Sequence, residues 1–352
     1  MRKLTSVVIG CGNIAREHLA ALATVDNVQV AAVCDLSPAR AEATAERFGI
    51  EKWYTDFEEL LAHIQPDLIH ITTPPSSHFS IAKTCLAAGL NVICEKPITL
   101  DYQQFGELKQ LATQNRCMLM ENQNLRFHSS IQRIQELIKS DKFGDVLEVQ
   151  IVISLNISST GSPYIDRNAP HFSTSLRGGI IGDFLPHIAY LTQMFTGSVI
   201  DLRTIWTKRI INSPLPADEF CGLIKGERAT AYVAFNGNAQ PNGCWVRVTG
   251  TRMHAEANLF ESPRLTLRRF RAGEPALMTF VDGISEARDV FRGTVAGFLR
   301  KLGGKTSYDG LPEFIARTYR ALELHEPQPI SLEEIDASVL LANRFTNPDV
   351  EL

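Results

Sequence analysis

The segment Gly10–Ala15 constrains the fold of this chain more than any other feature. Its sequence, Gly-Cys-Gly-Asn-Ile-Ala, directly follows an apolar run, Ser6–Ile9, and opens an amphipathic stretch, Ile14–Ala23. Gly10 permits a tight turn, and Gly12 lets the backbone approach a pyrophosphate whose charge a helix N-terminus stabilises. A glycine turn between a strand and a helix therefore predicts a nucleotide-binding βαβ unit at the start of the chain.

The first 122 residues continue this alternation of strand-like and helix-like segments. The predicted buried strands are Ser6–Ile9, Val28–Cys34, Leu68–Thr72, Asn91–Cys94 and Cys117–Glu121. The predicted helices are Ile14–Ala23, Pro38–Phe48, Phe57–His63, Phe79–Ala88 and Tyr102–Gln114. Such alternation is typical of a doubly wound parallel sheet. We therefore expect residues 1–122 to form a Rossmann dinucleotide-binding domain of the α/β class.

The pattern changes in residues 123–352, for which we expect an α+β substrate-binding domain. A helix at Ser130–Lys139 and a strand at Val146–Ser154 precede a long irregular stretch, Leu155–Arg177, which favours a functional loop. Strand-like runs then follow one another up to residue 270, so we expect a mainly antiparallel open sheet. The predicted helices after it are Ser285–Leu302, Leu311–Leu324 and Leu332–Arg344. The sheet face without helices should be apolar, so we expect a homodimer or homotetramer that packs through it.

Composition excludes several classes of function. The net charge of −4 offers no basic surface for nucleic acid, and no apolar run reaches the roughly 20 residues of a membrane helix. The seven cysteines are odd in number and widely spaced, which indicates reduced thiols in the cytoplasm. Their spacing predicts no metal site.

Two further segments in the first domain are candidates for binding the dinucleotide. Asp35 ends the second strand, where a carboxylate can accept hydrogen bonds from both ribose hydroxyls and repels a 2′-phosphate. We therefore predict NAD rather than NADP as the cofactor. Thr73, Pro74 and His78 follow the strand Leu68–Thr72, at the edge of the sheet where ligands bind. A proline turn with a serine cap for the next helix explains this second segment equally well.

Glu95-Lys96-Pro97 follows the strand Asn91–Cys94. The proline restricts the backbone of the lysine before it. A lysine in that position can polarise a carbonyl group or transfer a proton. The alternative is a solvated Glu–Lys pair in a surface loop.

A glycine-rich segment in the second half, Gly178–His187, ends in a second candidate pair. If a helix begins near Asp183, then Asp183 and His187 lie on one face and Pro186 lies in the first turn. His187 titrates near neutral pH and can accept the proton of a substrate hydroxyl. The alternative is a helix-capping Asp183 and a packed His187.

Together these segments resemble the Gfo/Idh/MocA family, which includes glucose–fructose oxidoreductase and inositol 2-dehydrogenase. The resemblance includes Gly10–Ala15, Glu95–Pro97 and Gly178–His187, and extends to Gln123–Phe127 and Trp245–Thr251. It implies that Lys96 and His187 flank the reacting carbon, that either acts as the acid–base, and that Asp183 positions the substrate or His187. It also implies a cis bond between Lys96 and Pro97.

Two positions depart from the family pattern. The family commonly has Gly where this chain has Leu185, and Asp where this chain has Tyr190. The first departure would reshape the floor of a pocket. The second removes a carboxylate that could help to bind substrate. Both bear on the class of substrate more than on the fold.

The resemblance implies hydride transfer between NAD(H) and a carbinol or keto carbon of a sugar, sugar derivative or cyclitol. The dinucleotide would contact Gly10, Gly12, Asn13, Ile14, Asp35, Thr73, Pro74, His78, Glu95 and Lys96. Arg126, Tyr164, Arg167 and Arg177 are candidates for the distal part of the substrate, although solvated loop side chains explain them as well. Two other functions stay open: glycoside hydrolysis through transient oxidation, and a non-catalytic regulator that binds the dinucleotide.

Overall fold

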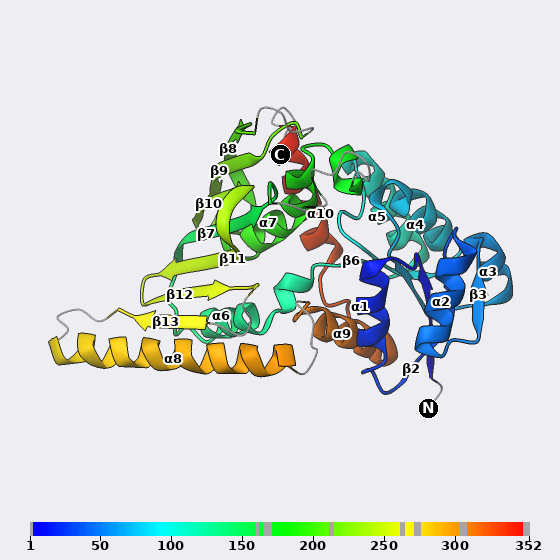
Figure 1. The fold of residues 1–352 in the computed structure, drawn as a ribbon, viewed down its shortest axis with the longest axis horizontal. Helices are drawn as coiled ribbons and strands as arrows, with labels where there is room; N and C mark the ends of the chain where they lie inside the picture. The colour runs from blue at the N-terminus through cyan, green and yellow to red at the C-terminus, as the bar shows by residue number, and fades with distance from the viewer. Residues whose placement is uncertain are drawn as a thin grey trace. The chain divides into compact units, whose positions relative to one another are not determined.

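The computed structural model describes residues 3–159, 162, 164, 171–210, 215–260, 265–270, 276–302 and 308–347 (Figure 1). Its contacts divide the chain into two compact units. Unit 1 comprises Met1–Asn124 and Gly310–Val339, and unit 2 comprises Leu125–Asp309 and Leu340–Leu352. Each unit has a sheet of its own.

The sheet of unit 1 has six parallel strands in the order β3-β2-β1-β4-β5-β6. The strands are β1 (Leu4–Ile9), β2 (Val28–Cys34), β3 (Lys52–Tyr54), β4 (Leu68–Ile71), β5 (Asn91–Cys94) and β6 (Leu119–Glu121). This topology confirms the predicted doubly wound parallel sheet. The strand order reverses between β1 and β4, and the carboxyl ends of the strands at such a point form the ligand-binding edge.

The helices of the first 124 residues lie close to their predicted positions. They are α1 (Asn13–Leu22), α2 (Pro38–Phe48), α3 (Phe57–His63), α4 (His78–Ala87) and α5 (Tyr102–Asn115), with a short 3₁₀ turn, η1 (Pro75–Ser77). Asp56 and Asp101 cap α3 and α5 by accepting backbone N–H groups of the first turn. The edge strand β3 was not predicted, because exposed Lys52 and Trp53 carry no signal of a buried strand.

The segment Gly310–Val339 groups with the first 124 residues, whereas the sequence predicted it in the second domain. Its helix α9 (Leu311–Leu324) packs against α1. Asn27 Nδ2 donates a hydrogen bond to Glu323 Oε1 at 2.6 Å, and Lys109 Nζ pairs with Asp336 Oδ2 at 2.7 Å. These contacts join residues that are far apart in the sequence, so local patterns could not reveal them.

The sheet of unit 2 has seven strands in the order β13-β12-β11-β7-β10-β9-β8. Its neighbouring strands are antiparallel except β7 and β10, which confirms the predicted, mainly antiparallel sheet. The strands are β7 (Val146–Asn156), β8 (Val199–Thr207), β9 (Glu219–Gly226), β10 (Thr230–Asn236), β11 (Asn238–Gly250), β12 (Met253–Asn258) and β13 (Leu265–Arg269).

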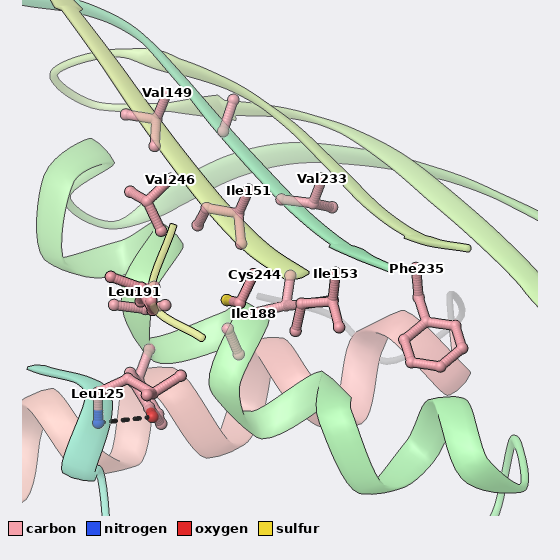
Figure 2. Packing of buried hydrophobic residues seen from close by; sticks show 14 of the residues in the cluster. Leu125, Val149, Ile151, Ile153, Ile188, Leu191, Val233, Phe235, Cys244 and Val246 are labelled. Atoms are coloured by element: carbon pink, nitrogen blue, oxygen red, sulfur yellow. Dashed lines mark hydrogen bonds between the residues drawn. The ribbon is translucent and has the colours of Figure 1, made fainter. Parts of the chain in front are cut away.

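Helix α7 (Ile180–Thr196) covers one face of this sheet and contacts β7, β9 and β10. The inward side chains of the strands form one buried cluster with Ile188 and Leu191 of this helix (Figure 2). Helices α6 (Ser129–Lys139) and α10 (Leu332–Thr346) also contribute buried residues to the cluster. The core of unit 2 therefore fixes the orientation of α7, which carries Asp183 and His187.

Helix α7 begins slightly before the start near Asp183 that the sequence analysis considered, and Asp183 lies in its first turn. The helix begins at Ile180, and Pro186 lies inside it instead of in its first turn. The preceding Gly179 has φ 63°, a left-handed conformation that glycine adopts without steric cost, and this conformation ends the loop earlier. Pro186 has no N–H, so the helix lacks the bond that this residue would make to the Gly182 carbonyl.

The opposite face of the unit 2 sheet carries mixed rows of side chains. One row runs from Ile205 through Cys221 and Val152 to Trp245, and a second runs from Arg203 through Leu223, Tyr232 and Gln150 to Arg247. Ile205 and Leu223 are each 64% exposed. The face is thus apolar along one row and mixed along the next, rather than apolar throughout as expected. Helix α8 (Ala276–Leu302) packs at the edge strand β13.

No helix within the described ranges is long and apolar enough to cross a membrane. The same described residues contain no group of three His, Cys, Asp or Glu side chains that could hold a metal ion.

Candidate functional site

The glycine turn lies between β1 and α1 at the carboxyl edge of the unit 1 sheet. Gly10 has φ 99°, and a Cβ atom on it would lie 2.7 Å from the backbone of Thr72 and Thr73. Any side chain at residue 10 would therefore push β1 away from the end of β4. Gly12 is the N-cap of α1, and a Cβ atom there would meet nothing within 4 Å. This open space beside the helix N-terminus fits the approach of a pyrophosphate.

Asp35 lies at the end of β2, directly beside this turn. Its Oδ2 accepts the N–H of Cys11 at 2.8 Å, and its Oδ1 accepts the N–H of Ser37 at 2.9 Å. The two bonds fix the direction of the carboxylate, and each oxygen keeps a further lone pair for a ribose hydroxyl. Leu36, the next residue, is 93% exposed and offers no donor to a phosphate.

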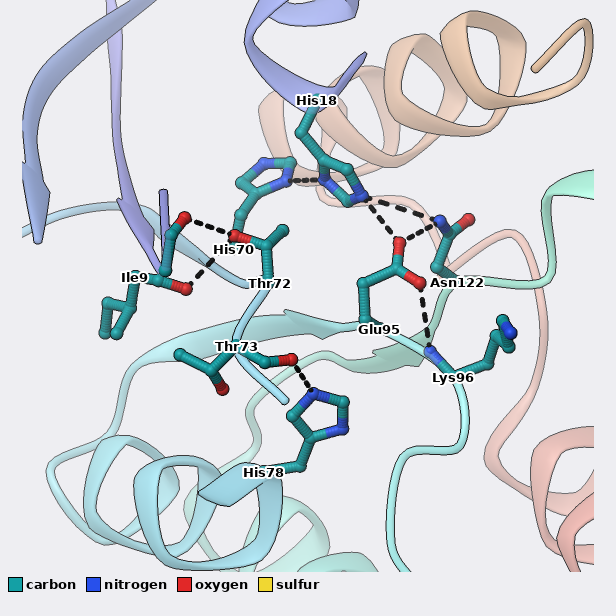
Figure 3. A network of polar contacts seen from close by, with 10 residues as sticks. Ile9, His18, His70, Thr72, Thr73, His78, Glu95, Lys96 and Asn122 are labelled. Atoms are coloured by element: carbon teal, nitrogen blue, oxygen red, sulfur yellow. Dashed lines mark hydrogen bonds and ion pairs between the residues drawn. The ribbon is translucent and has the colours of Figure 1, made fainter. Parts of the chain in front are cut away.

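The loop after β4 holds Thr73, Pro74 and His78. The ring of His78 is fully buried, and its Nδ1 lies 2.8 Å from the Pro97 carbonyl. Its Nε2 lies 2.8 Å from the Thr73 carbonyl (Figure 3). Burial lowers the pKa of His78, although the two carbonyls oppose this shift. Ser77 makes no capping bond to the helix, so the alternative of a serine cap does not describe this loop.

The loop after β5 carries Glu95 and Lys96. Glu95 is buried, so the alternative of a solvated Glu–Lys pair does not apply to it. Its Oε1 bonds His18 Nε2 at 2.8 Å and the side-chain amide of Asn122, and its Oε2 accepts the N–H of Lys96 at 3.3 Å (Figure 3). The Lys96–Pro97 peptide bond is cis, as predicted. The buried carboxylate therefore holds the backbone that presents Lys96.

A chain of buried polar side chains continues from His18 to the C-terminal segment of unit 1. His18 Nδ1 lies 2.8 Å from His70 Nδ1, and His70 Nε2 lies 3.0 Å from the Tyr319 hydroxyl. Sequence reasoning missed all three residues. A signal existed for His18, which shares the buried face of α1 with Ala15 and Leu22, because a buried polar ring needs a partner.

The protonation states in this chain follow from burial and charge. Burial alone would raise the pKa of Glu95, but the bonds and charge from His18, with Asn122 and Lys96, outweigh it and lower that pKa. Burial and the neighbouring His18 lower the pKa of His70 well below its usual value, so this ring is neutral. The ionised Glu95 only accepts, so His18 donates its Nε2–H to Glu95 Oε1.

Unit 2 contributes Asp183 and His187, which lie one turn apart on α7. Asp183 is in the first turn of the helix and is 7% exposed, whereas His187 is half-buried. The Nδ1 atom of His187 lies 2.6 Å from the hydroxyl of Tyr190. That hydroxyl also accepts the N–H of Leu125 at 3.2 Å (Figure 2). Asp183 is not the helix cap that the alternative interpretation assumed, because Gly179 has that position.

The two departures from the family pattern have different structural consequences. Leu185 is 1% exposed and belongs to the core cluster of unit 2, so it packs against the sheet. Tyr190 is fully buried and places its hydroxyl on His187. The side chain that replaces the carboxylate thus contacts the candidate catalytic histidine directly.

The candidate substrate residues are all in unit 2. Arg126 is 9% exposed, and its carbonyl accepts a hydrogen bond from Gln132. The ring of Tyr164 packs edge-on against that of His171, with centroids 5.0 Å apart. Arg177 is exposed just before α7, and Arg167 lies outside the described residues. The roles of these residues stay predictions.

Comparison with known families matches both parts of the chain. Residues 4–123 match the model described as an oxidoreductase family with an NAD-binding Rossmann fold, and residues 131–256 match the GFO/IDH/MocA C-terminal domain. The chain belongs to the Gfo/Idh/MocA family of oxidoreductases. This membership confirms the resemblance seen in the motifs.

Curated relatives in this family include sugar and cyclitol dehydrogenases. D-apiose dehydrogenase of Paraburkholderia graminis is 26% identical over 226 residues, which are 64% of this chain and 57% of the relative. Inositol 2-dehydrogenase of Rhizobium meliloti is 29% identical over 190 residues, which are 54% of each chain. The matches thus span little more than half the length of these relatives.

Solved structures of the same fold cover nearly the whole chain. The WlbA dehydrogenase of Bordetella pertussis, in complex with NADH and UDP-GlcNAcA, has a TM-score of 0.80 at 15% identity and covers 99% of this chain and 97% of its own. An oxidoreductase of Agrobacterium radiobacter, in complex with NAD+, L-tartaric acid and magnesium, has a TM-score of 0.76 at 20% identity, with coverage of 97% and 94%.

Proposed function

We propose that this protein transfers a hydride between NAD(H) and a carbinol or keto carbon of a sugar, sugar derivative or cyclitol. The observation that carries this proposal is that the glycine turn follows β1 and Lys96 follows β5. Only β4 lies between these two parallel strands, so both features lie at the same carboxyl edge of the sheet. Residues at the carboxyl ends of β1, β4 and β5 would hold a dinucleotide bound at the turn. When bound, the nicotinamide supplies the hydride chemistry.

The side chains of this chain supply binding, orientation and proton transfer. Gly10, Gly12, Asn13 and Ile14 surround the helix N-terminus that would face the pyrophosphate, and Asp35 would bind the ribose. Lys96 is a proton donor or acceptor for the substrate oxygen, and the buried Glu95 fixes its backbone. In unit 2, His187 is the second side chain that acts on the reacting oxygen of the substrate, and Asp183 orients the substrate.

We propose NAD as the cofactor in preference to NADP. Backbone N–H groups fix the carboxylate of Asp35, which would face the ribose. Among the hydrogen bonds of the described residues, neither Leu36 nor the exposed Arg40 makes one to this carboxylate. A 2′-phosphate would face this negative charge and would lose the hydrogen bonds that the ribose hydroxyl makes.

We also propose that copies of the chain associate through the open face of the unit 2 sheet into a homodimer or homotetramer. The apolar row that includes Ile205 and Trp245 lies on this face beside the exposed Leu223 and Tyr232. In this row Ile205 is exposed and Cys221, Val152 and Trp245 are half-buried, and contiguous apolar surface of this kind is typical of interfaces. The seven free cysteines favour the cytoplasm as the compartment.

The proposed activity is tested by a screen of sugars, cyclitols and nucleotide sugars with NAD+, followed by the absorbance of NADH. We expect at least one polyhydroxylated substrate to reduce the cofactor stoichiometrically. Release of a cleaved glycoside without net reduction would indicate transient oxidation instead. Tight binding of NADH without turnover on any of these classes would favour a regulator and contradict the proposal.

A further inference from the structure

The hydroxyl of Tyr190 lies within hydrogen-bond distance of both the Leu125 N–H and His187 Nδ1, so it can influence which nitrogen of the histidine carries the proton. The Leu125 N–H can only donate, so the Tyr190 oxygen accepts that bond at 3.2 Å. The same hydroxyl has one proton to donate, and His187 Nδ1 lies 2.6 Å away. The two rings meet edge to face, with an interplanar angle of 81° and centroids 5.5 Å apart.

We propose that Tyr190 is a positioning residue that holds the proton of neutral His187 on Nε2. With Nδ1 accepting from Tyr190, Nε2 carries the N–H and would be the ring nitrogen that donates a hydrogen bond to a substrate oxygen. A donor nitrogen polarises a substrate carbonyl but has no lone pair with which to accept the proton of a hydroxyl. This inference rests on the proposed function and divides its roles: Lys96 transfers the proton, and His187 donates a hydrogen bond to the reacting oxygen.

A carboxylate at position 190 would produce the opposite arrangement. A carboxylate only accepts, so it would bind Nδ1–H and leave the lone pair of Nε2 free for a substrate proton. It would also stabilise the protonated ring by its charge, which an uncharged phenol does not do. Tyr190→Asp should therefore convert His187 from a hydrogen-bond donor into a proton acceptor.

The first test uses the wild-type protein and needs no substrate. Nitrogen-15 NMR of the histidine rings at pH 8, with His187 assigned by its absence in His187→Gln, distinguishes the two tautomers. We expect the Nε2–H form for His187 in the wild type and the Nδ1–H form in Tyr190→Asp. An Nδ1–H tautomer in the wild type would overturn the proposal, whatever the fate of the variants.

The second test uses turnover of the substrate found in the screen. In the wild-type background, Lys96→Met should lose roughly 10²–10⁴ in kcat for alcohol oxidation. The double variant Lys96→Met, Tyr190→Asp should have a kcat at least about tenfold higher than that of Lys96→Met, because His187 can then accept the proton. The matched control is Thr192→Val, which removes another buried hydroxyl of α7, bonded to the Ile188 carbonyl, without touching His187.

The outcomes separate the two proposals. Rescue by Tyr190→Asp but not by Thr192→Val supports the role of Tyr190. Absence of rescue in a folded double variant contradicts it. If no substrate turns over in the screen, the proposed function fails, and the tautomer of His187 in the wild type still decides whether Tyr190 sets its proton.

Discussion

The preference for NAD over NADP should depend on the carboxylate of Asp35, and Asp35→Ser tests this. In the structure both carboxylate oxygens accept backbone N–H groups, at 2.8 Å from Cys11 and 2.9 Å from Ser37, so the charge cannot rotate away from an approaching phosphate. Two like charges about 5 Å apart repel by roughly 1 kcal/mol in water and by roughly 3 kcal/mol at an effective dielectric constant of 20. Because Asp35 is half-buried, we expect about 1–3 kcal/mol, or roughly a 10- to 100-fold preference for NAD.

The assay is the ratio of the dissociation constants of NADH and NADPH, measured by fluorescence titration. In Asp35→Ser this ratio should approach one, because the charge is gone and the serine hydroxyl can donate to a phosphate. The matched control is Asp67→Ser. Asp67 is also half-buried and accepts a backbone N–H, that of Thr5 at 2.8 Å, but it precedes β4 and lies at the opposite edge of the sheet.

The control separates loss of charge at the cofactor edge from general loosening of the sheet. Both serine variants should unfold more easily, because each leaves backbone N–H groups without a charged acceptor, but only Asp35→Ser should change the ratio. Equal affinities in the wild type would remove Asp35 from the explanation. A preference that persists unchanged in Asp35→Ser would show that another residue makes the choice.

Three further predictions concern turnover, pH and assembly. Lys96→Met and His187→Ala should each lower kcat by roughly 10²–10⁴ while NADH affinity changes much less; near-normal turnover of both variants would refute their roles. Burial lowers the pKa values of His70 and His78 in the folded protein, so the unfolded chain binds more protons below about pH 6.5. The free energy of unfolding should then fall by up to about 1.4 kcal/mol per pH unit for each histidine, and urea midpoints that stay constant between pH 7.5 and 5.5 would contradict this. Light scattering at micromolar concentration should give a dimer or tetramer mass, and a monomer mass would exclude association through the unit 2 sheet.

Much of the fold could be predicted because its elements have strong local periodicity. The strands Val28–Cys34 and Asn91–Cys94 and the helix Pro38–Phe48 have the predicted bounds, since apolar runs and proline at the first helical position are local signals. The start of α7 could not be predicted as well. It depends on the left-handed backbone of Gly178 and Gly179, which permits but does not require a helix to begin there.

In the candidate site, too, residues with a local sequence signal could be predicted, whereas residues that depend on long-range contacts could not. Gly10, Asp35 and Lys96 could be proposed from the sequence because they follow strand ends that a parallel sheet brings to one edge. The bond between His70 and Tyr319 joins residues 249 positions apart, and no local pattern names the partner of a buried ring. The sequence shows that Tyr190 stands where the family commonly has Asp. The contact of its hydroxyl with His187 became apparent only from the structure of α7.

The grouping of Gly310–Val339 with the first 124 residues affects how the chain can fold during its synthesis on the ribosome. The parallel sheet leaves the ribosome first, but α9 and the Tyr319 hydroxyl that complete its core emerge only after the 185 residues between Asn124 and Gly310. At the usual 5–20 residues per second, this interval lasts about 10–40 s. During this interval the side of α1 that packs on α9 and the Nε2 atom of His70 lack the partners that they have in the folded chain. A chain that stops before residue 310 would lack the closing element of its first unit, although the lost residues lie at its far end.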